Sequence, residues 1–136
     1  MSCAYDLAYY VANTLSKGTL GVNVYCNLLF EDPDNQIAIA EYGGRPADMA
    51  MGGTADPDAL EYPSVQVCVR NLNAQTAYET AYSIYKSLDG LGSVTINGNT
   101  YDYMKALQPP FIEDRDTSGR ATVRFNLWVT RRRSAT

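Results

Sequence analysis

Two stretches of the chain alternate strictly between apolar and polar residues, and they constrain the fold more than any other feature. In residues 64–70 the valines at 65, 67 and 69 share one face of an extended chain. Residues 121–130 repeat the pattern with four apolar residues: Val123, Phe125, Leu127 and Val129. Successive side chains of a strand point to opposite faces. Both stretches therefore predict β-strands that bury one face and leave the other uncovered.

The opposite face of these two predicted strands is polar or amphipathic. It consists of Gln66, Cys68, Arg70, Arg124, Asn126 and Trp128. A sheet face of this composition suits either water or an interface with a partner. We therefore take Arg70, Arg124 and Trp128 as candidate interaction residues.

Two amphipathic helices are predicted. Residues 2–17 carry apolar side chains at three- and four-residue spacing, with Ser2 as the N-cap and Gly18 as the stop. A second helix with the same spacing begins after Asn73 and stops at Gly90. Each helix has one apolar stripe with which it can cover a sheet.

Further strands are expected around these elements. Residues 36–42 alternate, and an Asn-Gly pair at 97–98 between residues 94–96 and 100–104 is a strong hairpin signal. Residues 20–30 are apolar and only partly alternating. The element order predicts a single α+β domain, a mostly antiparallel sheet of four to five strands with two helices packed on one face. This domain spans residues 1–130.

Residues 43–63 are expected to form a long loop. They hold four glycines and three prolines without periodicity, and a loop of this length in a compact domain is usually functional or disordered. Arg45, Met49 and Met51 belong to residue types enriched at interfaces, so we add them to the candidate interaction residues.

Residues 131–136 are expected to form a basic C-terminal tail. It begins with Arg131 and Arg132, which could meet an acidic partner or phosphate. A solvated tail is the alternative that we favour.

The residue types that catalysis needs are scarce. The chain has no histidine, the commonest general base and a common zinc ligand. Cys3, Cys26 and Cys68 lack the spacing of a zinc site and the usual activator of a cysteine nucleophile. Their odd number and wide spacing favour a reduced compartment over a disulfide framework. We therefore expect no enzymatic activity, no metal and no cofactor.

Two segments match known ligand-binding motifs only in part. Residues 114–119 match the first half of a calcium-binding loop, but the twelfth position, which needs a bidentate glutamate, is Phe125. The glycine pairs at 43–44 and 52–53 stand in no phosphate-binding pattern. An acidic turn and loop flexibility explain them better.

Charge and hydropathy restrict the partners. The net charge of −4 and the pI near 4.7 disfavour a non-specific nucleic-acid binder. No apolar run approaches the roughly 20 residues of a membrane span, and the N-terminus lacks the pattern of an export signal. Eleven tyrosines stand against three phenylalanines. Such tyrosines line either the core edge or a surface that becomes half-buried against a partner.

The order of landmarks follows a known pattern. A proline-led strand at 62–70 is followed by a helix rich in alanine and tyrosine at 74–90, a hairpin at 97–99, and an acidic turn that leads through Gly119-Arg120 to a final strand. Over about residues 7–130, this order resembles the tail terminator proteins of tailed bacteriophages, also called tail completion or minor capsid proteins.

The resemblance implies a virion structural protein of the tail and neck. Its members form a hexameric ring that caps the tail tube and joins the tail to the head, with the tail tube protein and head–tail connector or adaptor proteins as partners. DNA passes through the lumen without specific binding, and an acidic lumen would repel its phosphates. By composition, the candidate lumen-facing acids are Asp32, Asp34, Glu113, Asp114 and Asp116. Assembly would take place in the host cytoplasm.

Two other functions remain open at the level of sequence. One is a head–tail connector or neck subunit of the same virion, which would bind heads emptied of tails. The other is a small non-viral ligand-binding domain that uses the uncovered sheet face. Such a domain should be monomeric, and its melting temperature should rise with ligand.

Overall fold

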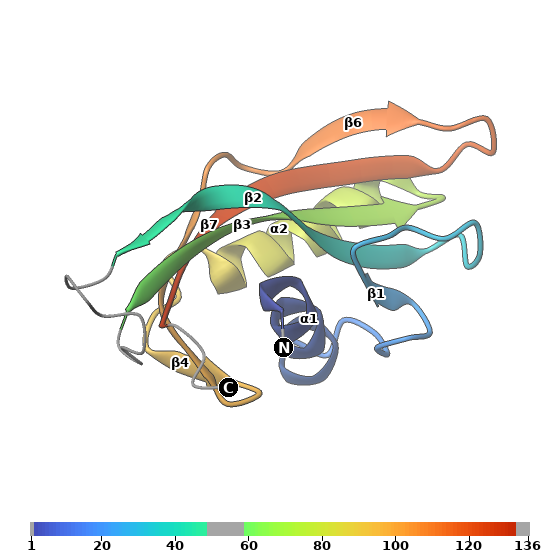
Figure 1. Cartoon of the computed structure of the whole chain (residues 1–136). Helices are drawn as coiled ribbons and strands as arrows, with labels where there is room; N and C mark the ends of the chain where they lie inside the picture. Colours follow the sequence, from blue (N-terminus) through green and yellow to red (C-terminus); the bar gives the residue numbers. More distant parts are fainter. Residues whose placement is uncertain (1, 49–58, 133–136) are drawn as a thin grey trace.

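The computed structural model describes residues 2–48 and 59–132. Its elements, in chain order, are α1 (Cys3–Tyr9), the π-helical turn η1 (Tyr10–Thr14), β1 (Val24–Cys26), β2 (Gln36–Asp48), β3 (Leu60–Asn71), α2 (Ala74–Leu88), β4 (Val94–Ile96), β5 (Asn99–Ala106), β6 (Phe111–Arg115) and β7 (Ala121–Arg132). The strands form one sheet in the order β1-β2-β3-β7-β5-β4, and β6 also pairs with β7. Both helices lie on one face of this sheet (Figure 1).

The sheet is mostly antiparallel, as predicted, since only β1 and β2 run parallel. The expected number of four to five strands was wrong, because the described residues form seven. The two strands that the sequence analysis missed, β1 and β6, are short. β1 has three residues, too few to show alternation, and β6 directly follows Pro109-Pro110, which indicates a break in the sequence.

The pairing of β3 with β7 forms the centre of the sheet. Val65, Val67 and Val69 lie opposite Leu127, Phe125 and Val123. All six side chains are buried in the core, together with the apolar stripes of both helices. Burying one such side chain contributes roughly 1.5–3 kcal/mol. The alternation that predicted these two strands therefore also defines the inner face of the domain.

The first helix is shorter and less regular than predicted. Ser2 is its N-cap, since its Oγ accepts a hydrogen bond from Tyr5 N at 3.1 Å. The regular helix ends at Tyr9, the π-turn follows, and Ser16 has a positive φ of 57°. Gly18 does not end the helix. A Cβ at this position would lie 2.8 Å from Val24 Cγ2, so this glycine permits a close approach to β1.

The second helix and the hairpin agree with the sequence analysis. Asn73 caps α2, accepting from Thr76 N at 3.1 Å, and Gly90 follows the helix with a φ of 81°. Asn97 and Gly98 join β4 to β5 with φ values of 51° and 81°. Two positive φ values at a two-residue loop match the twist of a hairpin.

The predicted loop at residues 43–63 was too long at both ends. Residues 43–48 continue β2, and residues 60–63 already belong to β3, with Gly44 opposite Pro63 and Arg45 opposite Tyr62. Glycine and proline hid this pairing, because they rarely occur within strands. The predicted tail also starts too early, since Arg131 and Arg132 pair with β3 as part of β7. The rest of the predicted tail lies outside the described residues.

A buried carboxylate joins α1 to the β4–β5 hairpin. Asp6 is fully buried, and it accepts hydrogen bonds from Asn97 Nδ2 at 3.1 Å, from Asn99 Nδ2 at 2.8 Å and from the Tyr101 hydroxyl. Burial of the Tyr101 ring and these contacts raise the pKa of its hydroxyl, which therefore stays protonated and donates. The sequence pattern suggested for Asp6 only a favourable position near the helix N-terminus.

We predict that Asp6→Ala strongly destabilises the fold, because it removes the carboxylate that accepts from the buried Asn99 and Tyr101 and from the exposed Asn97. A loss of about 3 kcal/mol in the free energy of unfolding is expected, and Tyr101→Phe, which removes one donor, should cost about 1 kcal/mol. Urea unfolding followed by circular dichroism measures both. Equal effects of the two substitutions would contradict this role of Asp6.

Candidate interaction surface

The outer face of the sheet, opposite the helices, has a covered end and an open end. At the covered end, the segment between β1 and β2 folds over the strands and is held by Arg70 and Arg120. At the open end, no described helix or loop lies over Trp128, which is 59% exposed. Among the described residues of the outer face, the central strands are therefore uncovered at this open end.

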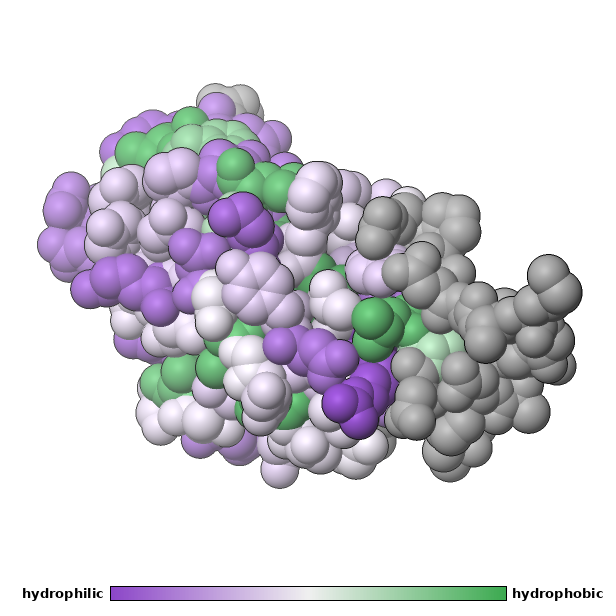
Figure 2. Space-filling model, turned by 90° about the vertical axis from the view of Figure 1, so that its left-hand side faces the viewer, coloured by the Kyte–Doolittle hydropathy of each residue, from purple (hydrophilic) through white to green (hydrophobic). Residues whose placement is uncertain are grey.

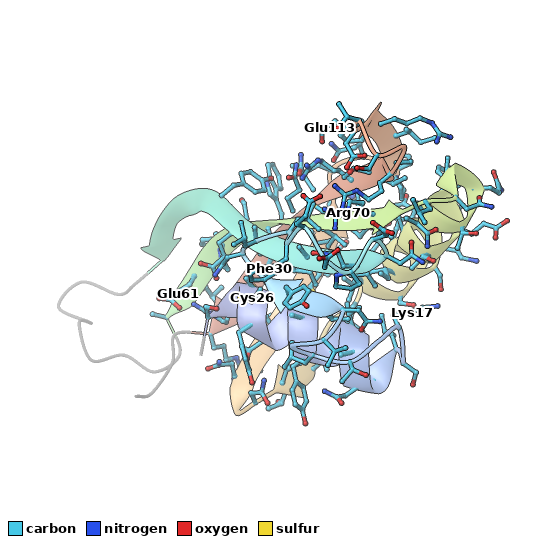
Figure 3. All side chains as sticks on the ribbon, turned by 90° about the vertical axis from the view of Figure 1, so that its right-hand side faces the viewer. Lys17, Cys26, Phe30, Glu61, Arg70 and Glu113 are labelled. Carbon is cyan, nitrogen blue, oxygen red and sulfur yellow. The ribbon has the colours of Figure 1, made fainter. Side chains whose placement is uncertain are left out.

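Arg70 holds the covering segment through its backbone. Its Nη2 donates to the carbonyl oxygens of Phe30 at 2.6 Å, Glu31 at 3.1 Å and Pro33 at 2.8 Å. Its Nε donates to Asp34 O at 3.1 Å. Figure 3 shows Arg70 between Phe30 and Glu113. With 7% of its surface exposed, Arg70 holds the covering segment in place, and a contact of this residue with a partner stays a prediction.

Arg120 also holds the covering segment, and the sequence analysis missed this role. We call Arg70 and Arg120 with their partners in this segment the clamp. Arg120 is 6% exposed. Its Nε contacts Asp116 Oδ2 at 2.6 Å, its Nη1 donates to Glu31 O at 2.7 Å, and a further ion pair joins it to Asp34 at 3.5 Å. The acidic residues at 31–34 and at 113–116 could have indicated a buried arginine between the two segments, because buried arginines usually have carboxylate partners.

The middle of the outer face carries a polar network. Gln66 Nε2 donates to Asn126 Oδ1 at 3.0 Å, and Arg124 Nη1 donates to Gln66 Oε1 at 3.0 Å. Arg124 also forms an ion pair with Glu113 of β6. These side chains come from adjacent strands in register, so the network forms a continuous polar surface on the outer face. Arg124 lies on the outer face, as predicted.

Aromatic side chains border this network at the open end. On β7, Trp128 and Thr130 alternate with the buried Leu127 and Val129 and therefore lie on the outer face. Tyr103 of β5 lies opposite Thr130 and is also exposed. A hollow of about 440 Å³ lies beside Trp128 and is lined by Gly44, Tyr62, Pro63, Ser64, Trp128, Val129 and Thr130. Aromatic side chains of this kind are enriched at protein interfaces.

This end of the molecule has a mixed surface. Figure 2 shows hydrophobic residues as separate patches among hydrophilic ones. With Trp128 and Tyr103 exposed beside the Gln66–Asn126 hydrogen bond, the open outer face combines polar and aromatic side chains, as protein interfaces often do.

The other predicted interaction residues differ in where they lie and in what they contact. Arg131 forms an ion pair with Glu61 at 3.1 Å, and Arg132 forms one with Asp102 at 3.2 Å. Arg45 lies in β2, where only its backbone pairing is described. Met49 and Met51 lie outside the described residues.

The predicted lumen-facing acids are largely engaged within the chain. Asp34 and Asp116 contact Arg120, and Glu113 contacts Arg124. Asp114 lies in β6 opposite Thr122. Asp32 is exposed in the covering segment. The structure thus shows ion pairs at three of the five positions, which composition alone did not reveal.

Residues 2–48 and 59–132 show neither a cluster of metal-ligand side chains nor a membrane-spanning helix. In these ranges, no three side chains of His, Cys, Asp or Glu come together as potential metal ligands. None of the helices found there has the length and hydropathy to cross a membrane.

Comparison with known proteins identifies the class. A family model described as "Bacteriophage tail terminator protein" matches residues 10–131. With nearly the whole chain matched, this is a structural protein of a bacteriophage tail. It belongs to the bacteriophage tail terminator family, as the order of its landmarks had indicated.

A solved structure has the same fold. A chain from "Virion of native gene transfer agent (GTA) particle" matches with a TM-score of 0.54 and 12% identity, over 93% of this chain and 84% of that chain. At this identity the likeness concerns the fold alone. A comparison with curated proteins found no match.

We predict that the clamp around Arg120 weakens in acid. Hydrogen bonds from the backbone N–H of Arg120 and from its side chain hold the pKa of Asp116 below the usual 3.8. A lowered pKa in the folded state stabilises the fold above pH 3.8, and this contribution is lost as the pH falls below that value. The stability difference between wild type and Asp116→Asn should therefore be constant near neutral pH and shrink below pH 3.8.

Chemical denaturation at a series of pH values measures this difference. Proteolysis of the covering segment between β1 and β2 provides a local readout. A stability difference that stays the same down to pH 3 would show that the Asp116 carboxylate does not stabilise the clamp.

Proposed function

We propose that this chain is the subunit of a hexameric ring that caps the tail tube and joins the tail to the head–neck assembly. The observation that carries the proposal is the family match over residues 10–131. A tube end and a neck are both built of other proteins, so a subunit between them needs broad contact surfaces rather than a pocket. The partners are then the tail tube protein on one side and connector or adaptor proteins on the other. The protein would assemble in the host cytoplasm and remain in the virion.

The open outer face supports this role. It combines a hydrogen-bonded network of Gln66, Arg124 and Asn126 with the exposed Trp128 and Tyr103. A hydrogen-bonded surface with aromatic anchors is typical of specific interfaces. We propose that this face contacts the tube or the neck, with Trp128 as its central anchor.

A passage for DNA is consistent with the charge of the chain. The net charge is −4, and an acidic lumen repels the phosphate backbone so that DNA slides without sticking. Among the proposed lumen acids, Asp32 is exposed, whereas Glu113 and Asp116 each have an arginine partner. We therefore place Asp32 first among the residues that face the DNA.

The connection between β2 and β3 supplies further proposed contacts. Arg45, Met49 and Met51 belong to residue types enriched at interfaces. We propose that these residues contact a neighbouring subunit or the tube.

The proposal is tested on growing tail tubes. Tail tube protein is polymerised with and without the purified chain, and tube lengths are measured by negative-stain microscopy. We expect short tubes with a ring at one end and no further growth. Unlimited growth in the presence of the chain would overturn the capping function, and binding to heads emptied of tails in place of tubes would favour a connector.

We predict that Trp128→Ala weakens capping without unfolding the chain. The side chain is mostly exposed, so the free energy of unfolding should change by less than about 0.5 kcal/mol. Truncation of an anchor residue in an interface, in contrast, weakens the binding free energy by about 2 kcal/mol or more. Leu72→Ala, at an exposed residue on the turn before α2, is the matched control. Capping at wild-type concentrations by the Trp128 variant would exclude this residue as an anchor.

A further inference from the structure

Apart from the open outer face, large exposed hydrophobic side chains gather at two opposite edges of the sheet. At one edge, Leu107, Phe111 and Ile112 are exposed on β6 and the segment before it; we call this group the β6 patch. At the other edge, Val22, Leu28 and Phe30 are exposed around β1; we call this group the β1 patch. Of the other large hydrophobic residues that the described chain exposes, Tyr82 packs against Tyr78 and Tyr85 along α2, and Tyr9 lies on α1.

The β6 patch surrounds an unprotected strand edge. Phe111 lies opposite Arg124, on the outer face, and Ile112 lies opposite Val123, on the inner face. Both apolar side chains are nevertheless exposed, at 40% and 53%. In the described part of the chain, β6 pairs with β7 alone. An edge strand with exposed apolar side chains on both faces is a template for association with another chain.

The β1 patch is built differently. The Tyr25 ring packs against Phe30 with 4.5 Å between ring centroids, and its hydroxyl donates to Val22 O at 2.6 Å. The backbone of Val24 bonds to the preceding turn, through Thr19 O at 3.2 Å and Gly21 N at 2.8 Å. The β1 patch is therefore an ordered group of apolar side chains held by internal contacts, whereas β6 is an edge strand that can pair with another strand.

We propose that the β6 patch of one copy of this chain binds the β1 patch of a second copy, head to tail. A two-fold dimer joins one self-complementary patch to itself, whereas a ring needs two unlike patches that meet between neighbours. β2, β3 and β7 lie between β1 and β6 in the sheet, so the two patches lie on opposite edges of the subunit (Figure 1). Each subunit in a row can therefore bind one neighbour through its β6 patch and the next neighbour through its β1 patch. The proposal rests on the ring of the proposed function and assigns its subunit contact.

Two single variants test the two patches. Leu28→Lys and Ile112→Lys each place a charge in one patch, and both positions are more than half exposed, so thermal unfolding should match the wild type. Tyr9→Lys, an exposed residue outside both patches, is the control. Each chain is chemically cross-linked alone and on purified tail tubes. We expect wild type and control to give products of up to six chains, and each patch variant to need about tenfold or more protein for the same yield.

Mixing the two patch variants tests the direction of the contact. Each variant keeps the patch that the other has lost, so the mixture retains one intact junction. We expect the Leu28→Lys and Ile112→Lys chains to cross-link into a product of two chains, one of each kind, and to stop there. Products of three or more chains from the mixture, or a two-chain product from either variant alone, would overturn the head-to-tail contact.

The outcomes separate this inference from the proposed function. If both patch variants assemble on tubes as the wild type does, the contact is elsewhere and the inference fails, while capping stands. If wild-type rings form through these patches but tubes keep growing, the capping function fails and the contact stands. A wild-type chain that stays single both alone and on tubes overturns both.

Discussion

The one-sided burial of the central β3–β7 pair is the constraint on which the rest of the structure depends. Val65, Val67 and Val69 meet the apolar side chains of β7 on one face, and both helices pack there. Because a single layer of helices satisfies the sheet, the opposite face receives no second layer. That face must then be covered by loops, water or another protein, and among the described residues a loop covers one end but not the other.

Buried charged groups keep this arrangement unique. Asp6 fixes the position of the β4–β5 hairpin relative to α1, and Arg70 and Arg120 fix the segment that covers one end of the outer face. Each of these side chains is buried with several hydrogen-bond partners, so removing a partner leaves an unpaired polar group at high cost. Apolar packing alone would not specify where these surface segments lie.

The division of the surface follows from the same constraint. The polar network and Trp128 lie where none of the described loops covers the sheet, and the two apolar patches lie where the sheet ends. A subunit of a ring that also contacts a tube and a neck needs separate surfaces for its neighbours and for its partners. The open outer face and the two apolar patches are separate surfaces of one fold, in keeping with a structural tail protein of the terminator family.

The sequence by itself determined the inner face, the second helix, the Asn-Gly hairpin and the family, because alternation, capping residues and turn residues are local signals. Only the tertiary structure decided the strands at β1 and β6, the extent of β2 through Gly43–Gly44, and the roles of Asp6, Arg70 and Arg120. Those features depend on partners tens of residues away, such as Asn99 for Asp6 and Phe30 for Arg70. A side chain that looks free in a local pattern can be fully engaged once the chain folds back on itself.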